Sequence, residues 1–135
     1  HVALPAEHPL ADDPVVALAA LKDEPFVASP RRLGQGFHDQ LIQLCQTAGF
    51  VPRVAQEARQ LQTVVALVAA GFGVALLPAS LAQTAGGDVV FRPIAADAPA
   101  SLLHLDLLIG WNPERASPVR DRLVVAVRQT LALVN

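Results

Sequence analysis

The side chains with a capacity for chemistry gather where two predicted strands end and two predicted helices begin. Ser29 follows the strand predicted at residues 25–28, and Arg31 and Arg32 come two and three positions later. A guanidinium can bind a carboxylate through two parallel hydrogen bonds, and a serine hydroxyl can donate or accept one. A nucleophilic role for Ser29 lacks the G-x-S-x-G turn and any histidine or acid placed by a motif. We therefore expect Ser29 and Arg31 to contact a ligand, with a loop cap and a solvated arginine as the alternatives.

The backbone at the two helix starts adds a second means of holding a ligand. The N–H groups of residues 36–38 and 60–63 have no partner within their own helices and favour a negative group. Around these groups lie Gly36, Phe37, Glu57, Gln62 and Thr63. The alternative at both places is ordinary capping, by water or by a side chain such as Glu57.

Metal and cofactor chemistry find no motif in the chain. The histidines are far apart and have no acid or cysteine at metal-ligand spacing; they are His1, His8, His38 and His104. Gly34 and Gly36 resemble half of a dinucleotide fingerprint, but the third glycine is missing. We expect no metal and no cofactor.

The elements that position these residues are organised around the stretch 56–80. An apolar helix is predicted at 61–70, Gly71 and Gly73 end it, and a buried strand follows at 74–77. With the strand predicted at 52–56, this forms a crossover unit and predicts an α/β sheet. In such sheets ligands bind where strands end and helices begin.

Periodicity and breakers predict the remaining elements. A helix at 37–48 ends at Gly49, and its apolar stripe consists of Phe37, Leu41, Leu44, Cys45 and Ala48. Its polar side carries Gln40, Gln43 and Gln46. Strands are predicted at 2–4, 25–28, 89–93 and 102–111, and helices at 14–22, at 78–84 and after the Ser117 cap. The last helix should carry Val119, Leu123, Val127, Leu131 and Val134 on its inward face, and the core for that face must lie elsewhere in the chain or in a partner.

Composition limits the classes of protein. The 135 residues are 53% hydrophobic and 16% charged, as in a globular fold. A net charge of −2 provides no basic footprint for nucleic acid. Cys45 is the only cysteine, and we expect a buried, inert thiol. Because no secretory signal or membrane span is recognisable, we expect a cytoplasmic protein.

Several segments together resemble one family. They are LPAEHPLA at 4–11, DEPFV at 23–27, CQTAGFVPRV at 45–54 and LVAAGFGVALLPAS at 67–80. In this order they resemble the effector-binding domain of LysR-type transcriptional regulators, over nearly the whole chain.

The resemblance implies an α/β fold like that of periplasmic binding proteins, with two lobes and a small effector between them. Residues 1–23 would belong to the first lobe, 24–96 would form a complete second lobe, and 97–135 would return to the first as a crossover strand and the C-terminal helix. The first lobe would be partial, because its opening elements would precede His1. An apolar face on residues 102–111 and on the last helix would then be exposed.

The resemblance also adds Pro78 to the effector side of the second lobe. The expected ligand-binding residues are then Ser29, Arg31, Gly36, Phe37, Glu57, Gln62, Thr63 and Pro78.

The function implied by the resemblance is non-enzymatic sensing of a small molecule to control transcription, with an anionic metabolite favoured as the effector. Such regulators form homodimers or homotetramers and bind DNA through an N-terminal domain that lies outside this chain. A solute-binding protein linked to transport is the alternative within the same fold class. An α/β enzyme is the third hypothesis, but no nucleophile, base and orienting group stand in a workable order.

Overall fold

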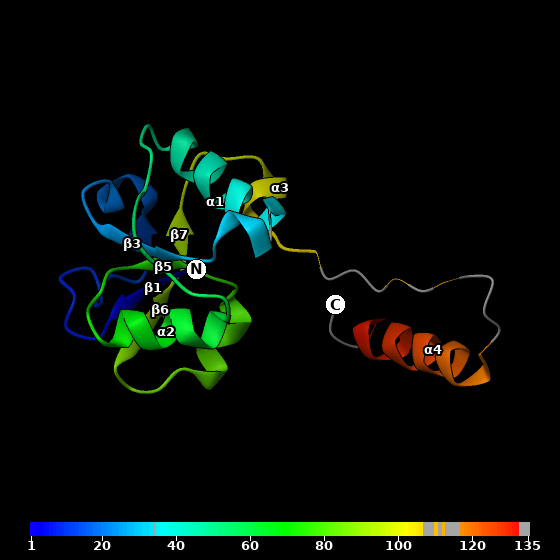
Figure 1. The fold of residues 1–135 in the computed structure, drawn as a ribbon. Coiled ribbons are helices and arrows are strands. Elements are labelled where there is room, and N and C mark those ends of the chain that lie inside the picture. The colour runs from blue at the N-terminus through cyan, green and yellow to red at the C-terminus, as the bar shows by residue number, and fades with distance from the viewer. Residues whose placement is uncertain (34, 107–109, 111, 113–116, 133–135) are drawn as a thin grey trace. The chain divides into compact units, whose positions relative to one another are not determined.

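The computed structural model describes residues 1–33, 35–106, 110, 112 and 117–132. The chain forms two compact units, His1–Leu105 and Asp106–Asn135. Figure 1 shows the sheet in the first unit and helix α4 in the second. No helix in the described part of the chain is long and apolar enough to cross a membrane.

The sheet of the first unit combines parallel and antiparallel pairs. β3 (Pro25–Ala28) and β4 (Arg53–Glu57) are parallel, and β1 (Val2–Pro5) lies antiparallel between β5 (Ala75–Leu76) and β6 (Val89–Arg92). A parallel bridge between Phe26 and Val74 joins the two groups of strands. It is closed by the Val27 N–H on the Val74 carbonyl and the Val74 N–H on the Pro25 carbonyl, both at 2.8 Å.

Two helices make the crossovers between the parallel strands. α1 (Gln35–Thr47) connects β3 to β4, and α2 (Leu61–Ala69) connects β4 to β5. Since β4 and the Val74 bridge flank β3 in the same direction, the predicted crossover unit is confirmed. Gly49 has a φ of 85° just after α1, which agrees with its predicted role as a helix stop.

Gly73 allows β5 to approach β3. Its φ is 148°, and a Cβ at this position would lie 2.2 Å from the Pro25 carbonyl oxygen. Only a residue without a Cβ fits here, so the glycine seen in the sequence as a helix breaker also holds two strands together.

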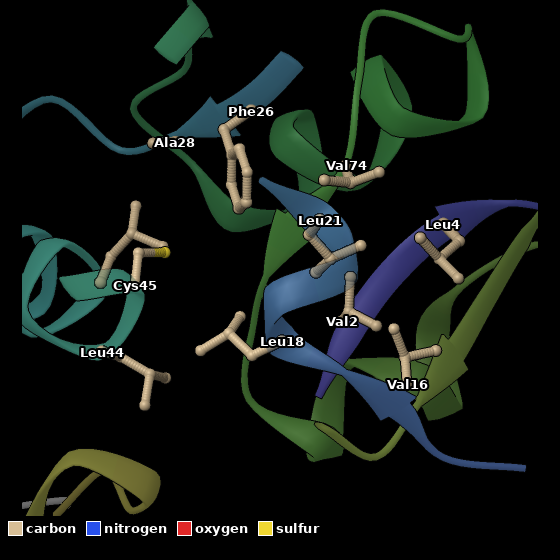
Figure 2. Close-up of a cluster of buried hydrophobic side chains, with 11 residues drawn as sticks. Val2, Leu4, Val16, Leu18, Leu21, Phe26, Ala28, Leu44, Cys45 and Val74 are labelled. Carbon is tan, nitrogen blue, oxygen red and sulfur yellow. The ribbon is translucent and has the colours of Figure 1, made fainter. Parts of the chain in front are cut away.

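The side chains of the sheet alternate between two cores, because successive residues of a strand point to opposite faces. Figure 1 shows α1 and α2 on these opposite faces. The α1-side core, drawn in Figure 2, consists of Val2, Leu4, Val16, Leu18, Leu21, Phe26, Ala28, Leu41, Leu44, Cys45 and Val74. The α2-side core consists of Ala3, Val27, Ala58, Val64, Val68, Ala75, Leu77 and Val89.

The helix predicted at 14–22 is wrong. Val16–Ala17 form β2, which pairs in parallel with β7 (Ile94–Ala95), and only Leu18–Leu21 form a 3-10 helix, η1. The Val16 N–H donates to the Pro93 carbonyl at 2.9 Å, and Leu18 and Leu21 are buried in the α1-side core. This tertiary pairing overrides a local pattern that would fit a helix equally well.

The segment between β3 and the middle of α1 contains regular structure from Arg31 onward. Arg31–Leu33 form a 3-10 turn, η2, and α1 begins at Gln35. Gly34, half of the weak dinucleotide pattern, lies outside the described residues. The short helix predicted at 78–84 is present as the 3-10 helix η3 (Ala79–Thr84).

The strand predicted at 102–111 is also wrong over its described beginning. Leu102 and Leu103 end the short helix α3 (Ala100–Leu103), and residues 107–109 and 111 lie outside the described part. Pro99 precedes the helix, and its carbonyl accepts the Leu102 N–H at 2.9 Å. A proline at the N-cap and contacts with α1 favour a helical turn over an extended backbone.

The observed units bear on the expected lobes. β1, within residues 1–23, pairs with β5 and β6, so it shares a sheet with residues assigned to the second lobe. The compact unit extends to Leu105, beyond the expected boundary at residue 96. The two-lobed division of an intact protein stays a prediction.

The second unit contains α4 (Pro118–Ala132). The Ser117 hydroxyl accepts the Arg120 N–H at 3.2 Å, which confirms the predicted cap. Val119 and Leu123 are 69% and 58% exposed, which agrees with the expected exposure of the apolar face of this helix in this chain. The side chain of Leu131 and residue Val134 lie outside the description.

Candidate functional site

A cavity of about 510 Å³ opens in the first unit beside the carboxyl end of β5. Its lining comes from α1, β5 and the residues after it, β7 and the segment around α3. The lining residues are His1, Phe37, Gln40, Leu41, Leu44, Leu76, Leu77, Pro78, Ala79, Ser80, Pro93, Ile94, Leu102, Leu103, His104 and Leu105.

Helix periodicity explains how α1 forms one wall. Phe37, Gln40, Leu41 and Leu44 stand at positions i, i+3, i+4 and i+7, which share one face of a helix. Leu41 and Leu44 are buried where this wall joins the α1-side core.

Strand β5 and the segment around α3 form the other walls. Pro78 lies two residues after β5, at the start of η3, and residues 102–105 run opposite α1. The cavity therefore lies at the edge of the sheet where ligands bind in open α/β folds.

The polar side chains of the cavity lining are few. His1, Gln40, Ser80 and His104 supply side-chain hydrogen-bonding groups, and none of the lining side chains is Lys, Arg, Asp or Glu. The Gln40 Nε2 donates to the carbonyls of Leu102 at 2.9 Å and His104 at 2.8 Å. This arrangement offers an apolar surface with hydrogen bonds at its rim, which is suited to holding a small molecule.

Phe37 and Pro78, of the residues expected to bind a ligand, line the cavity. The other six do not. Gly36 is exposed in the first turn of α1, and Glu57, Gln62 and Thr63 are exposed around the start of α2. A ligand-binding role for all eight stays a prediction.

Ser29 and Arg31 have partners within the protein. The Ser29 carbonyl accepts a hydrogen bond from the His38 Nδ1 at 3.0 Å. The Arg31 guanidinium donates to both carboxylate oxygens of Asp39, at 2.8 and 3.1 Å. This hydrogen bonding and the opposite charge raise the pKa of Arg31 and lower that of Asp39.

Sequence reasoning missed most of the cavity. The spacing of Gln40, Leu41 and Leu44 from Phe37 could have placed them on the same wall, but Gln40 was assigned to the solvent side of the helix. His104 was considered only as a metal ligand. The local pattern at 102–111 predicted a strand. Nothing in it indicated that residues 102–105 form a wall opposite α1.

Metal and thiol chemistry have no site in the described residues. No group of three or more His, Cys, Asp or Glu side chains that could hold a metal ion occurs among them. Cys45 is buried, and burial raises the pKa of its thiol to about 12. The predicted burial of this cysteine is confirmed, and its thiol is protonated at neutral pH.

Comparison with known proteins identifies the family. The model of the family described as "LysR substrate binding domain" matches residues 1–132. The chain belongs to this family. The resemblance seen in the sequence and the predicted fold class, an α/β fold like that of periplasmic binding proteins, are both confirmed.

Curated relatives of this LysR-family chain are transcriptional regulators. It is 37% identical over 123 residues to the regulator TtuA of Agrobacterium vitis, covering 91% of this chain and 40% of TtuA. It is 38% identical over 128 residues to XapR of Escherichia coli, covering 95% of this chain and 41% of XapR. The chain thus spans about two-fifths of the length of these relatives. Both relatives are named as HTH-type transcriptional regulators, in agreement with the prediction of a non-enzymatic regulator.

Solved LysR-family structures share the fold. The C-terminal domain of a probable regulator from Rhodococcus sp. RHA1 matches with a TM-score of 0.60 and 38% identity, covering 73% of this chain and 48% of that one. The BenM effector-binding domain with its effector benzoate matches with a TM-score of 0.62 and 29% identity, covering 71% of this chain and 44% of that one.

Proposed function

We propose that this chain is the effector-sensing part of a LysR-type transcriptional regulator and that it binds a small molecule in the cavity beside Phe37 and Pro78. The observation that carries the proposal is the cavity itself, which lies at the carboxyl edge of the sheet in a chain of this family. A conformational response requires that the effector binds one state of the protein more tightly than the other.

The lining supports an effector with an apolar body. A volume of about 510 Å³ lies within the range of pockets that hold small organic molecules. Phe37, Leu76 and Pro78 offer apolar contacts, and Gln40 and Ser80 can orient a polar substituent. Benzoate, the effector of the similar BenM domain, combines these two features.

The anionic character of the effector stays a prediction. The expected partner, Arg31, is paired with Asp39 and does not line the cavity. No Lys or Arg side chain lines the cavity, so the lining offers no guanidinium or lysine ammonium to a charged group on the effector.

The intact protein would bind DNA through a separate N-terminal domain and act in the cytoplasm as a homodimer or homotetramer. Its relatives are named as HTH-type transcriptional regulators and are more than twice as long as this chain. The net charge of −2 supports the assignment of DNA binding to another part of the protein. The transport-linked alternative has no support among these relatives.

The test uses the full-length regulator and a panel of small aromatic and aliphatic acids and their uncharged amides, with benzoate included. Binding is measured by calorimetry, and the response by a promoter reporter. Phe37→Ala should weaken binding of the responding compound about tenfold, because it removes about half of a phenyl group's apolar contact.

Phe72→Ala is the matched control. Phe72 is 49% exposed and lies outside the cavity lining, so its loss should leave binding unchanged. Equal effects of the two substitutions would place the effector elsewhere. Comparing each acid with its amide separately tests the anionic preference.

A further inference from the structure

The side chain of Gln40 joins α1 to the segment around α3. Its Nε2 lies 2.9 Å from the Leu102 carbonyl oxygen and 2.8 Å from that of His104, with the Ser101 carbonyl at 3.5 Å. These partners are more than 60 positions away in sequence. Gln40 is thus the side chain that ties this wall of the cavity to the helix opposite.

The chemistry of the contact needs a donor at this position. The last carbonyls of a helix have no partner within it, and α3 is a single turn. An amide NH₂ carries two protons and can satisfy two carbonyls at once. A carboxylate of the same shape can only accept and would face these oxygens with a negative charge.

A second contact keeps the segment folded on itself. The His104 Nδ1 lies 2.8 Å from the Ala100 carbonyl oxygen. Because a carbonyl can only accept, this nitrogen carries the proton. The turn from Ala100 to His104 is therefore closed locally by His104 and attached to α1 by Gln40.

The residues that Gln40 holds line the cavity and also stand at the end of the first unit. Gln40, Leu102 and His104 all line the cavity. The first unit ends at Leu105, immediately after these residues. The hydrogen bonds of Gln40 therefore hold both a wall of the cavity and the last residues of the first unit.

We propose that Gln40 is the positioning residue of the effector cavity: its amide fixes residues 102–105 as the wall opposite Phe37, and with them the start of the connection to α4. This inference rests on the proposed function for its effector, but the attachment itself does not. Loss of the donor should open the wall and weaken binding while the sheet stays folded.

The experiment uses the full-length protein without ligand. Hydrogen exchange is measured by mass spectrometry on peptides covering residues 99–106, in the wild type and in Gln40→Glu, Gln40→Lys and Gln43→Glu. Gln40→Glu should accelerate exchange in these peptides about tenfold, as expected for the loss of the paired hydrogen bonds. Peptides from β1 and β3 should be unchanged.

Two variants separate the donor from other effects. Gln40→Lys keeps a donor and should retain the protection, whereas a role in packing alone would make Glu and Lys equally damaging. Gln43→Glu places the same charge on an exposed position of α1 outside this cavity, and should match the wild type. Equal exchange in Gln40→Glu and Gln43→Glu, or equal loss in Gln40→Glu and Gln40→Lys, would overturn the proposal.

A second measurement connects the wall to binding. The uncharged apolar dye N-phenyl-1-naphthylamine is titrated by fluorescence, and Gln40→Glu should weaken its binding at least about fivefold relative to Gln43→Glu. Faster exchange with unchanged dye binding would overturn the positioning role. Suppose that both measurements give the expected results but Phe37→Ala changes the binding of no compound in the panel. The proposed function would then fail, and the positioning role of Gln40 would stand.

Discussion

The starts of α1 and α2 look alike in sequence and differ in the structure. Both helices begin after a parallel strand at the same edge of the sheet, and both leave backbone N–H groups free of helical partners. Yet Phe37 in the first turn of α1 lines a cavity, whereas Gln62 and Thr63 in the first turn of α2 are exposed and line none of it.

The difference comes from what faces each helix start. The segment around α3 packs against α1 and is held there by Gln40. The buried contacts of α2 are with the sheet, through Val64 and Val68. In the described residues, the helix start that faces a second wall lines the cavity, and the start of α2 does not.

The largest expected effect on stability comes from disrupting the packing of α2 on the sheet. Val68 is fully buried in the α2-side core, so Val68→Asp should lower the free energy of unfolding by about 4 kcal/mol or more, because an unpaired carboxylate is buried. This is a large part of a domain's stability. Urea unfolding followed by circular dichroism measures it.

Ala66→Asp is the control on the same helix. Ala66 is exposed, and its replacement should change stability by only about 1 kcal/mol or less, the cost of the lower helix propensity of Asp. If both variants were equally stable, α2 would not be anchored through Val68.

The next test concerns the two glycines between α2 and β5. Gly73→Ala should destabilise the protein by about 3 kcal/mol, because its Cβ would collide with the Pro25 carbonyl and separate β5 from β3. Gly71→Ala meets open space and only a positive φ of 78°, so it should cost about 1 kcal/mol. Thermal unfolding ranks the two, and equal costs would mean that close strand approach has no role.

Much of the fold could be predicted because its signals are local. The apolar stripes of α1 and α2 and the stops at Gly49 and Gly71 place both helices within one or two residues. The predictions at 14–22 and 102–111 were wrong because pairing with β7 and packing on α1 decide these segments. Such partners are distant in sequence and leave no periodic pattern.

The cavity was less predictable than the sheet. The rule that ligands bind at strand ends located the correct edge and the residues Phe37 and Pro78. It could not choose between the two helix starts, since that choice depends on the wall at 102–105. Gln40 was read as solvent-facing because hydrophobic periodicity does not distinguish a glutamine in water from one bound to distant carbonyls.

A third test examines the buried side of α1. The pKa of the Cys45 thiol is raised from 9.0 to about 12 by burial. Below pH 9 the thiol is protonated in both states, and its contribution to stability is intact. As pH rises above 9 the unfolded thiol ionises first, so stability should fall by about 1.4 kcal/mol per pH unit up to about pH 12.

Few other side chains of this sequence titrate between pH 9 and 12. The sequence contains no tyrosine and a single lysine, Lys22, which is exposed. Cys45→Ala should remove most of the decline in stability between pH 9 and 11. A decline that is unchanged in this variant would mean that the thiol is accessible to water in the folded protein.

The smallest expected effect decides whether the two helix starts differ in function. An effector held by the cavity alone predicts that Thr63→Ala and Arg31→Ala each change its affinity less than about twofold in the full-length regulator, because neither side chain lines the cavity and Arg31 is already paired with Asp39. Calorimetry measures the effector affinity of each variant, and the loss in Phe37→Ala serves as the reference. If Thr63→Ala instead matched the loss in Phe37→Ala, the effector would reach α2 as well. The intact protein would then have to supply a wall there that residues 1–105 do not provide, and both helix starts would belong to one larger site.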